Sequence, residues 1–95
     1  MVAYAIVDVE IHDIEAFLNY QKKIGPFLND AGGRYLARGG ESRVYEGDFE
    51  PNRLLLLEFP SLDVLDEFYN SEIYQSLGAE REACCECRII GVKGL

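Results

Sequence analysis

Basic residues are scarce in this sequence, and their scarcity argues against one large class of partners. Lys and Arg total 9 against 17 Asp and Glu, which gives a net charge of −8. Nucleic-acid binding draws most of its affinity from basic side chains on phosphates, and acidic lipid surfaces likewise attract basic clusters. We therefore expect neither nucleic acid nor membrane among the partners, and we attribute the acidic charge to solubility.

Long hydrophobic runs are missing as well. No stretch approaches the roughly 18 consecutive apolar residues that a membrane-spanning helix needs. The chain starts with Val2-Ala3-Tyr4-Ala5-Ile6-Val7 and then turns acidic, without the positive start and cleavage pattern of a signal peptide. These absences predict a cytoplasmic protein.

The residues that build metal sites are few and poorly spaced. There is one histidine, and the three cysteines are Cys84, Cys85 and Cys87. This spacing does not match the paired cysteines of zinc sites, so we expect no metal and no other cofactor. In a reducing cytoplasm the cysteines should be free thiols. We interpret them as small buried hydrophobes, with redox sensing as the alternative.

The residues that build a core are plentiful. Apolar residues make up 48% of the 95 positions and include six Tyr and five Phe, so the composition is that of an ordered protein. A chain of this length has room for one domain over residues 1–95.

Periodicity predicts the order strand, helix, strand, strand, helix, strand. Alternating or apolar runs indicate strands at 2–11, 34–38, 53–59 and 88–92, and residues 43–46 should extend the second strand after a bend at Gly39-Gly40. Asp13 should cap a helix that Pro26 either kinks or ends near Ile24, because the proline ring clashes with the preceding turn, and a last turn could continue to Asp30. Ser61 and Ser71 should open further helical segments that end near residue 83.

This βαββαβ order predicts an α+β, ferredoxin-like fold with a four-stranded antiparallel sheet and all helices on one face. The first and third strands should then be central, and both are apolar on alternate faces. Helices can cover only one of these faces. We expect a second copy of the chain to cover the other, as a C₂ homodimer.

Three segments together resemble one known family. They are residues 32–40 (GGRYLARGG), 57–61 (LEFPS) and 68–75 (FYNSEIYQ). The chain, from Ala3 to the final strand, closely resembles the bacterial domain of unknown function family 1330. Two features depart from the family pattern, namely Phe68, where Trp is usual, and the cysteine cluster.

Members of that family look like dimeric α/β barrels, in which two ferredoxin-like sheets pack face to face. The wider superfamily includes cofactor-free monooxygenases, lactone isomerases and haem-dependent enzymes. The resemblance therefore implies a pocket rather than a particular reaction.

Arg38 is the first candidate for a ligand-binding residue. Strand spacing predicts that Arg34, Leu36 and Arg38 point to one face, where the arginines could hold a carboxylate or an enolate. The alternative is a salt bridge at the sheet edge, to Glu58 or Glu46.

The other candidates are Glu58, His12 and the tyrosines. Glu58 lies at the end of a leucine-rich strand. Its carboxylate should therefore be either at the solvent-exposed edge of the sheet or paired with another polar group in a pocket. His12 could serve as a general base, a common role of histidine, although a histidine in a turn is more often solvated. Tyr35, Tyr69 and Tyr74 suit the core, and their hydroxyls could orient a small oxygenated ligand.

Two functions of different class remain open. The first is a pocket that binds a small polar or anionic organic molecule, with or without cofactor-free catalysis. The second is a dimeric module with a structural or regulatory role. A cleft that holds Arg38, Glu58 and a tyrosine together would favour the first function, and a sheet interface filled by side chains would favour the second.

Overall fold

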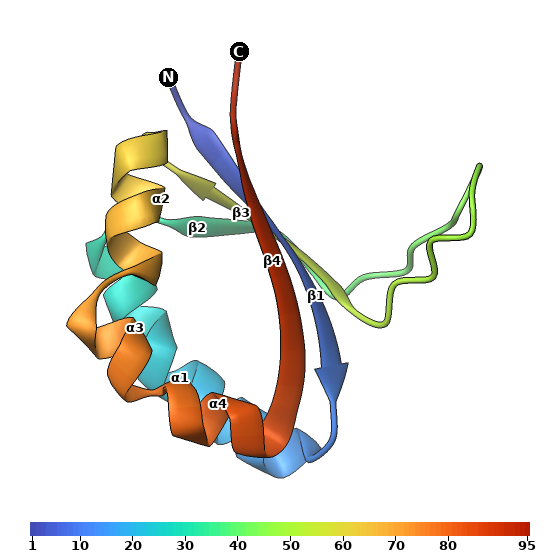
Figure 1. Cartoon of the computed structure of the whole chain (residues 1–95), viewed down its shortest axis with the longest axis horizontal. Coiled ribbons are helices and arrows are strands. Elements are labelled where there is room, and N and C mark those ends of the chain that lie inside the picture. Colours follow the sequence, from blue (N-terminus) through green and yellow to red (C-terminus); the bar gives the residue numbers. More distant parts are fainter.

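The strands form one antiparallel sheet with every helix on the same side of it (Figure 1). The computed structural model describes residues 1–95. Its elements are β1 (Ala3–Ile11), α1 (Ile14–Asp30), β2 (Arg34–Arg38), β3 (Leu54–Phe59), α2 (Leu62–Tyr69), α3 (Glu72–Ser76), α4 (Gly78–Cys84) and β4 (Cys85–Lys93). The strand order is β2-β3-β1-β4, which puts the first and third strands in the centre as predicted. The α+β ferredoxin-like fold is confirmed.

The core lies between the sheet and the helices. Strand register places Ala5 between Leu57 and Gly91, and Val7 between Leu55 and Ile89, on the face that the helices cover. Small residues on β1 let aromatic side chains from the helices approach the sheet closely. The fully buried Phe59 ring lies 5.5 Å from that of Phe68, centroid to centroid.

Helix α1 runs through Pro26, which corrects the expectation that the regular helix ends near Ile24. Pro26 lies on the exposed side of the helix, so water can satisfy the carbonyl that loses its backbone partner. Ile24 and Leu28, on either side of the proline, are both buried, so packing anchors the helix before and after Pro26. The helix ends at Asp30, and Gly32, whose φ of +83° suits glycine, turns the chain just after it.

The predicted serine caps are present. The Ser61 Oγ accepts a hydrogen bond of 3.1 Å from the N–H of Val64, and the Ser71 Oγ accepts one of 3.1 Å from the N–H of Tyr74. These caps begin α2 and α3 as short separate helices. The chain can therefore turn between them and bring α4 back beside α1.

Residues 39–53, which we call the arm, project away from the sheet on the side opposite the helices (Figure 1). The expected extension of β2 over residues 43–46 is wrong, because these residues have no strand partner. Gly39, with a φ of +71°, turns the chain out of β2. Val44, Tyr45 and Phe49 of the arm are exposed to solvent.

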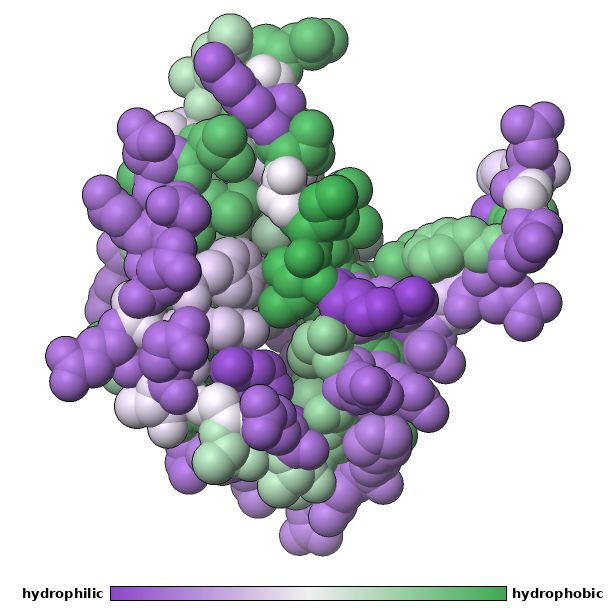
Figure 2. Space-filling view, in the orientation of Figure 1, coloured by the Kyte–Doolittle hydropathy of each residue, from purple (hydrophilic) through white to green (hydrophobic).

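The other face of the sheet, which we call the open face, is apolar and uncovered. Ile6 lies between Leu56 and Ile90 in the strand register, and Tyr4 lies beside Val92. Ile90 is 64% exposed. Apolar atoms gather over β4 in the space-filling view (Figure 2). None of the helices combines the length and the apolar character required to cross a membrane.

Candidate functional site

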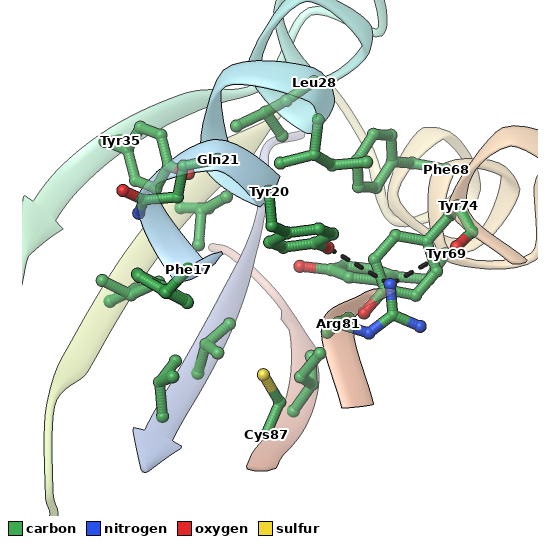
Figure 3. A pocket seen from close by; sticks show the side chains of 16 residues that line it. Phe17, Tyr20, Gln21, Leu28, Tyr35, Phe68, Tyr69, Tyr74, Arg81 and Cys87 are labelled. Atoms are coloured by element: carbon green, nitrogen blue, oxygen red, sulfur yellow. Dashed lines mark hydrogen bonds between the residues drawn. The ribbon is translucent and has the colours of Figure 1, made fainter. Parts of the chain in front are cut away.

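A cavity lies between the sheet and the helices (Figure 3). Its volume is about 60 Å³. Fourteen of its 16 lining residues are hydrophobic, and the other two are Gln21 and Arg81. An apolar hollow with few polar groups is the usual form of a small-molecule site. Its lining is Val7, Val9, Phe17, Tyr20, Gln21, Ile24, Leu28, Tyr35, Leu55, Leu57, Phe68, Tyr69, Tyr74, Arg81, Cys87 and Ile89.

Arg81 brings a positive charge to this apolar wall. Its Nη1 donates hydrogen bonds of 3.2 Å to the Tyr20 hydroxyl and 3.3 Å to the carbonyl oxygen of Tyr74. The guanidinium carbon lies 3.9 Å from the centroid of the Tyr74 ring, within the range of a cation–π contact. None of the salt bridges in the structure involves Arg81, so this half-buried cation has no carboxylate partner.

The protein keeps Arg81 charged in spite of its burial. Burial is the largest single influence and lowers the pKa of Arg81, but the hydrogen bond to Tyr20 and the charge interactions with Tyr20, Tyr74 and Cys87 together outweigh it, so the pKa lies above its usual value. The site therefore presents a fixed cation at the edge of an apolar hollow, where an anionic oxygen would be attracted.

The tyrosines around Arg81 are hydrogen-bond donors at neutral pH. Burial raises the pKa of Tyr20, Tyr69 and Tyr74 above the usual value, so their hydroxyls stay protonated. The rings of Tyr69 and Tyr74 meet edge to face, with centroids 4.9 Å apart. This packing orients both rings at the cavity.

Three of the predicted site residues line this cavity, namely Tyr35, Tyr69 and Tyr74. Arg38 lies next to it but is exposed, with its guanidinium carbon 4.3 Å from the centroid of the Tyr35 ring. The expectation that Arg34 and Arg38 share a face is wrong. The register of β2 shifts between Tyr35 and Ala37, and this irregularity puts Arg38 on the helix side with Tyr35.

Arg34 and Glu58 lie on the open face. The Arg34 Nε donates a hydrogen bond of 3.0 Å to the Glu58 Oε1, which is the salt bridge considered as an alternative for this strand. Glu58 alternates with the cavity-lining Leu57 along β3, so it points away from the cavity. The structure thus separates Glu58 from Arg38 and does not form the cleft that would have joined them.

His12 lies at a second hollow at the start of β4, together with Cys85 and Glu86. Its side chain is exposed, while its backbone N–H donates 2.9 Å to the carbonyl of Cys84. Arg81 and Tyr74 border both hollows. His12 is therefore near the cavity's polar end without lining it.

The three cysteines are free thiols in the structure. The sulfur atoms of Cys85 and Cys87 are 3.7 Å apart, and Cys87 lines the cavity. Burial raises the pKa of Cys84 and Cys85 to about 11, and it also raises that of Cys87. Protonated thiols are poor nucleophiles and poor metal ligands. No group of three His, Cys, Asp or Glu side chains is placed to hold a metal ion.

Sequence reasoning missed Arg81, Tyr20 and Gln21. Arg81 follows Tyr74 by seven residues, a spacing that marks one helix face only if the helix is unbroken, and here α3 and α4 are separate. Gln21 carried a usable signal, because it occupies the apolar stripe of α1 among Phe17, Ile24 and Leu28. A polar side chain inside such a stripe is expected to form a hydrogen bond with another residue or with a ligand.

Comparisons with known proteins agree with this architecture. The model of the family described as Domain of unknown function (DUF1330) matches residues 2–95. A protein of unknown function from Rhodopseudomonas palustris is 20% identical, with a TM-score of 0.75 over 99% of this chain and 82% of that one. No curated protein matches the sequence.

Two further solved structures share the fold. A dimeric ferredoxin-like protein of unknown function from Jannaschia sp. CCS1 is 15% identical, with a TM-score of 0.68, over 99% of this chain and 100% of that one. SnoaB from Streptomyces nogalater, described as a cofactor-independent oxygenase, is 8% identical, with a TM-score of 0.69, over 99% of this chain and 93% of that one. At these identities the likeness concerns the fold alone.

Proposed function

The chain belongs to the DUF1330 family, and from that premise we propose that it binds a small organic anion in the cavity beneath its helices and works as a homodimer. The observation that carries the proposal is Arg81, a cation without a carboxylate partner at the wall of an otherwise apolar cavity. The ligand that matches this wall has an apolar or aromatic body and one anionic oxygen. Tyr20, Tyr69 and Tyr74 would surround that oxygen with hydroxyl donors.

The proposal concerns binding and names no reaction. The cavity lining contains arginine, glutamine, protonated tyrosines and a protonated thiol, and none of these groups is a base at neutral pH. The description of SnoaB as a cofactor-independent oxygenase shows that this fold can support catalysis in another protein. For this chain, catalysis would need a base supplied by the substrate or by His12 at the neighbouring hollow.

A second copy of the chain is the partner that best fits the open face. Leu56, Ile6 and Ile90 form an apolar row across three strands, and apolar surface of this kind is stabilised when it is removed from water. Two fold neighbours are described as dimeric, which supports the same arrangement. The cytoplasmic location expected from the sequence stays a prediction. Light scattering at micromolar concentration should give twice the chain mass of 10.7 kDa, and a folded monomer at every concentration would contradict the dimer.

The binding proposal is tested by titrating benzoate, an apolar ring with one carboxylate, and following the backbone amide signals by NMR. Benzoate should shift signals of the cavity lining. Arg81→Met should weaken its binding about 10- to 150-fold, because a charge-assisted hydrogen bond is worth about 1.5 to 3 kcal/mol. Arg43→Met, on the exposed arm, is the matched control and should bind as the wild type does.

Arg38→Met decides between the two candidate arginines. Arg38 is exposed beside Tyr35, so its loss should weaken binding less than the loss of Arg81. A larger loss with Arg38→Met would move the anchor to Arg38. If benzoate shifts no cavity signal in the wild type, the dimeric module without a ligand becomes the better description.

A further inference from the structure

Gln21 is the second polar residue in the cavity lining, and its environment is unlike that of Arg81. It lies on the sheet-facing side of α1 among Phe17, Ile24 and Leu28, all of which line the same cavity. Its Nε2 atom is buried and has no hydrogen-bond partner. A buried amide donor without a partner is costly, and most such groups in folded proteins are satisfied.

One other buried side-chain nitrogen in the structure lacks a partner, the Nε of Arg53. Arg53 packs directly against Gly39, where a Cβ would approach its Nε to 2.5 Å, and it does not line the cavity. Its unpaired donor is therefore explained by close packing at the base of the arm. Gln21, by contrast, lines the cavity.

Gln21 and Arg81 face the cavity from different elements, α1 and α4. In the close-up view Gln21 lies on the side of Tyr35 and Arg81 on the side of Tyr74, with the aromatic side chains between them (Figure 3). The Nη1 of Arg81 donates hydrogen bonds to Tyr20 and Tyr74. The Nε2 of Gln21, by contrast, is buried and has no hydrogen-bond partner.

We propose that the Nε2 of Gln21 donates a hydrogen bond to a carbonyl oxygen of the ligand whose anionic group lies at Arg81. The ligand class is then an aromatic or otherwise apolar carboxylate or phenolate that carries a carbonyl group away from its anionic end. This inference rests on the proposed function, since it assigns a second recognition point to the same cavity. It gives Gln21 a role in specificity, because a ligand without the carbonyl leaves the buried donor unpaired.

The test compares two probes of nearly equal shape, 4-acetylbenzoate and 4-isopropylbenzoate. Both carry a ring and a carboxylate, and only the first has a carbonyl oxygen at the far end. In titrations followed by NMR or calorimetry, the wild type should bind 4-acetylbenzoate about 5- to 10-fold more tightly, the range expected for one hydrogen bond to a buried donor. Gln21→Met, which keeps the length of the side chain and removes the donor, should lower this ratio to about 1.

Each outcome separates the two proposals. If the preference is the same in the wild type and in Gln21→Met, or is absent from the wild type, Gln21 has no role in recognition, while dependence of both probes on Arg81 upholds the anion site. If neither probe binds the wild type, both proposals fail. A purely structural Gln21 would change the melting temperature of the Met variant and leave the ratio unaltered. Gln21→Leu, which also lacks the donor, should reproduce the loss of preference.

Discussion

The two faces of the sheet are built by alternate residues of the same strands. On the helix side, Ala5 and Leu57 are at most 4% exposed. One residue further along β1, Ile6 is 41% exposed, and Ile90 beside it is 64% exposed. The two faces differ in how well they are covered, and both carry apolar side chains.

This comparison shows that apolar residues in a strand predict which side chains will be buried. They do not predict whether the same chain or a second copy buries them. The helix side is covered by elements of the same chain, and its aromatic side chains pack around a cavity instead of filling it completely. The open face has no such cover, and it is the surface where we propose that a second copy binds. The proposed ligand site and the proposed dimer surface are therefore on opposite sides of one sheet.

The largest expected effect is on the covered face. Phe59 is fully buried and its ring contacts those of Phe68 and Tyr69. Phe59→Ala should lower the free energy of unfolding by about 3 to 5 kcal/mol, because it removes buried contacts and leaves a cavity. Urea denaturation measures this change. Tyr45→Ala, at an arm residue that is 91% exposed, should stay within about 0.5 kcal/mol of the wild type, and a similar loss in both variants would contradict the placement of the core.

A smaller effect should separate the open face from the rest of the surface. Ile6 and Ile73 are equally exposed, at 41% each, but Ile6 is in the centre of the open face and Ile73 is on α3. Ile6→Glu should weaken the dimer by about 1 to 3 kcal/mol, roughly 5- to 150-fold, because each copy loses apolar contact and brings a charge to the interface. Ile73→Glu should leave the mass measured by sedimentation unchanged. Dissociation by both substitutions, or by neither, would place the interface elsewhere.

The smallest effect concerns the one polar side chain that is buried on the open face. The Asp8 carboxylate accepts 2.7 Å from the Nη2 of Arg88 and 2.8 Å from the backbone N–H of Asn52, so it fastens the base of the arm to β1. The hydrogen bond from Arg88 holds the pKa of Asp8 below its usual value, against the opposing effect of burial. Asp8→Asn should cost about 0.5 to 1.5 kcal/mol at neutral pH.

The pH dependence of that cost follows from the direction of the shift. A lowered pKa in the folded state means that the carboxylate stabilises the fold fully above the unfolded pKa of about 3.9, and that this contribution is lost as the pH falls through the lower folded value. The difference in unfolding free energy between the wild type and Asp8→Asn should therefore shrink towards zero in strong acid. Denaturation curves taken from pH 6 downward measure it, and a constant difference would show that Asp8 does not titrate in this range.

Much of the fold was predictable because local patterns and topology agree. Alternation along β1, the leucine run of β3 and the serine caps at Ser61 and Ser71 each specify an element without help from distant residues. The predictions failed where the local structure depends on contacts with residues distant in sequence or on exposure to solvent. Pro26 is tolerated because the side of α1 that carries it faces water. Residues 43–46 stay outside the sheet because their backbone has no strand beside it.

The site was less predictable because it depends on a shift in register and on the return of α4. Tyr35, Tyr69 and Tyr74 could be chosen from their chemistry alone, and all three line the cavity. The faces of Arg34 and Arg38 could not be chosen, because the irregularity of β2 reverses the alternation between them. The role of Arg81 could not be predicted, because it depends on the turn between α3 and α4 that places Arg81 beside Tyr20 and Tyr74.

The pairing of β1 with β4 joins the two ends of the chain, from Ala3 beside Lys93 to Ile11 beside Cys85. Contacts between residues so far apart in sequence form slowly, since a long loop must close before they contribute. During synthesis from the N-terminus, β1 can pair with β3 along one edge as soon as β3 has emerged. Its other edge stays unpaired until β4 has been synthesised. The nascent protein therefore carries an apolar central strand with one unpaired edge until β4 has been synthesised, and during this interval a chaperone or a misplaced strand would compete with β4.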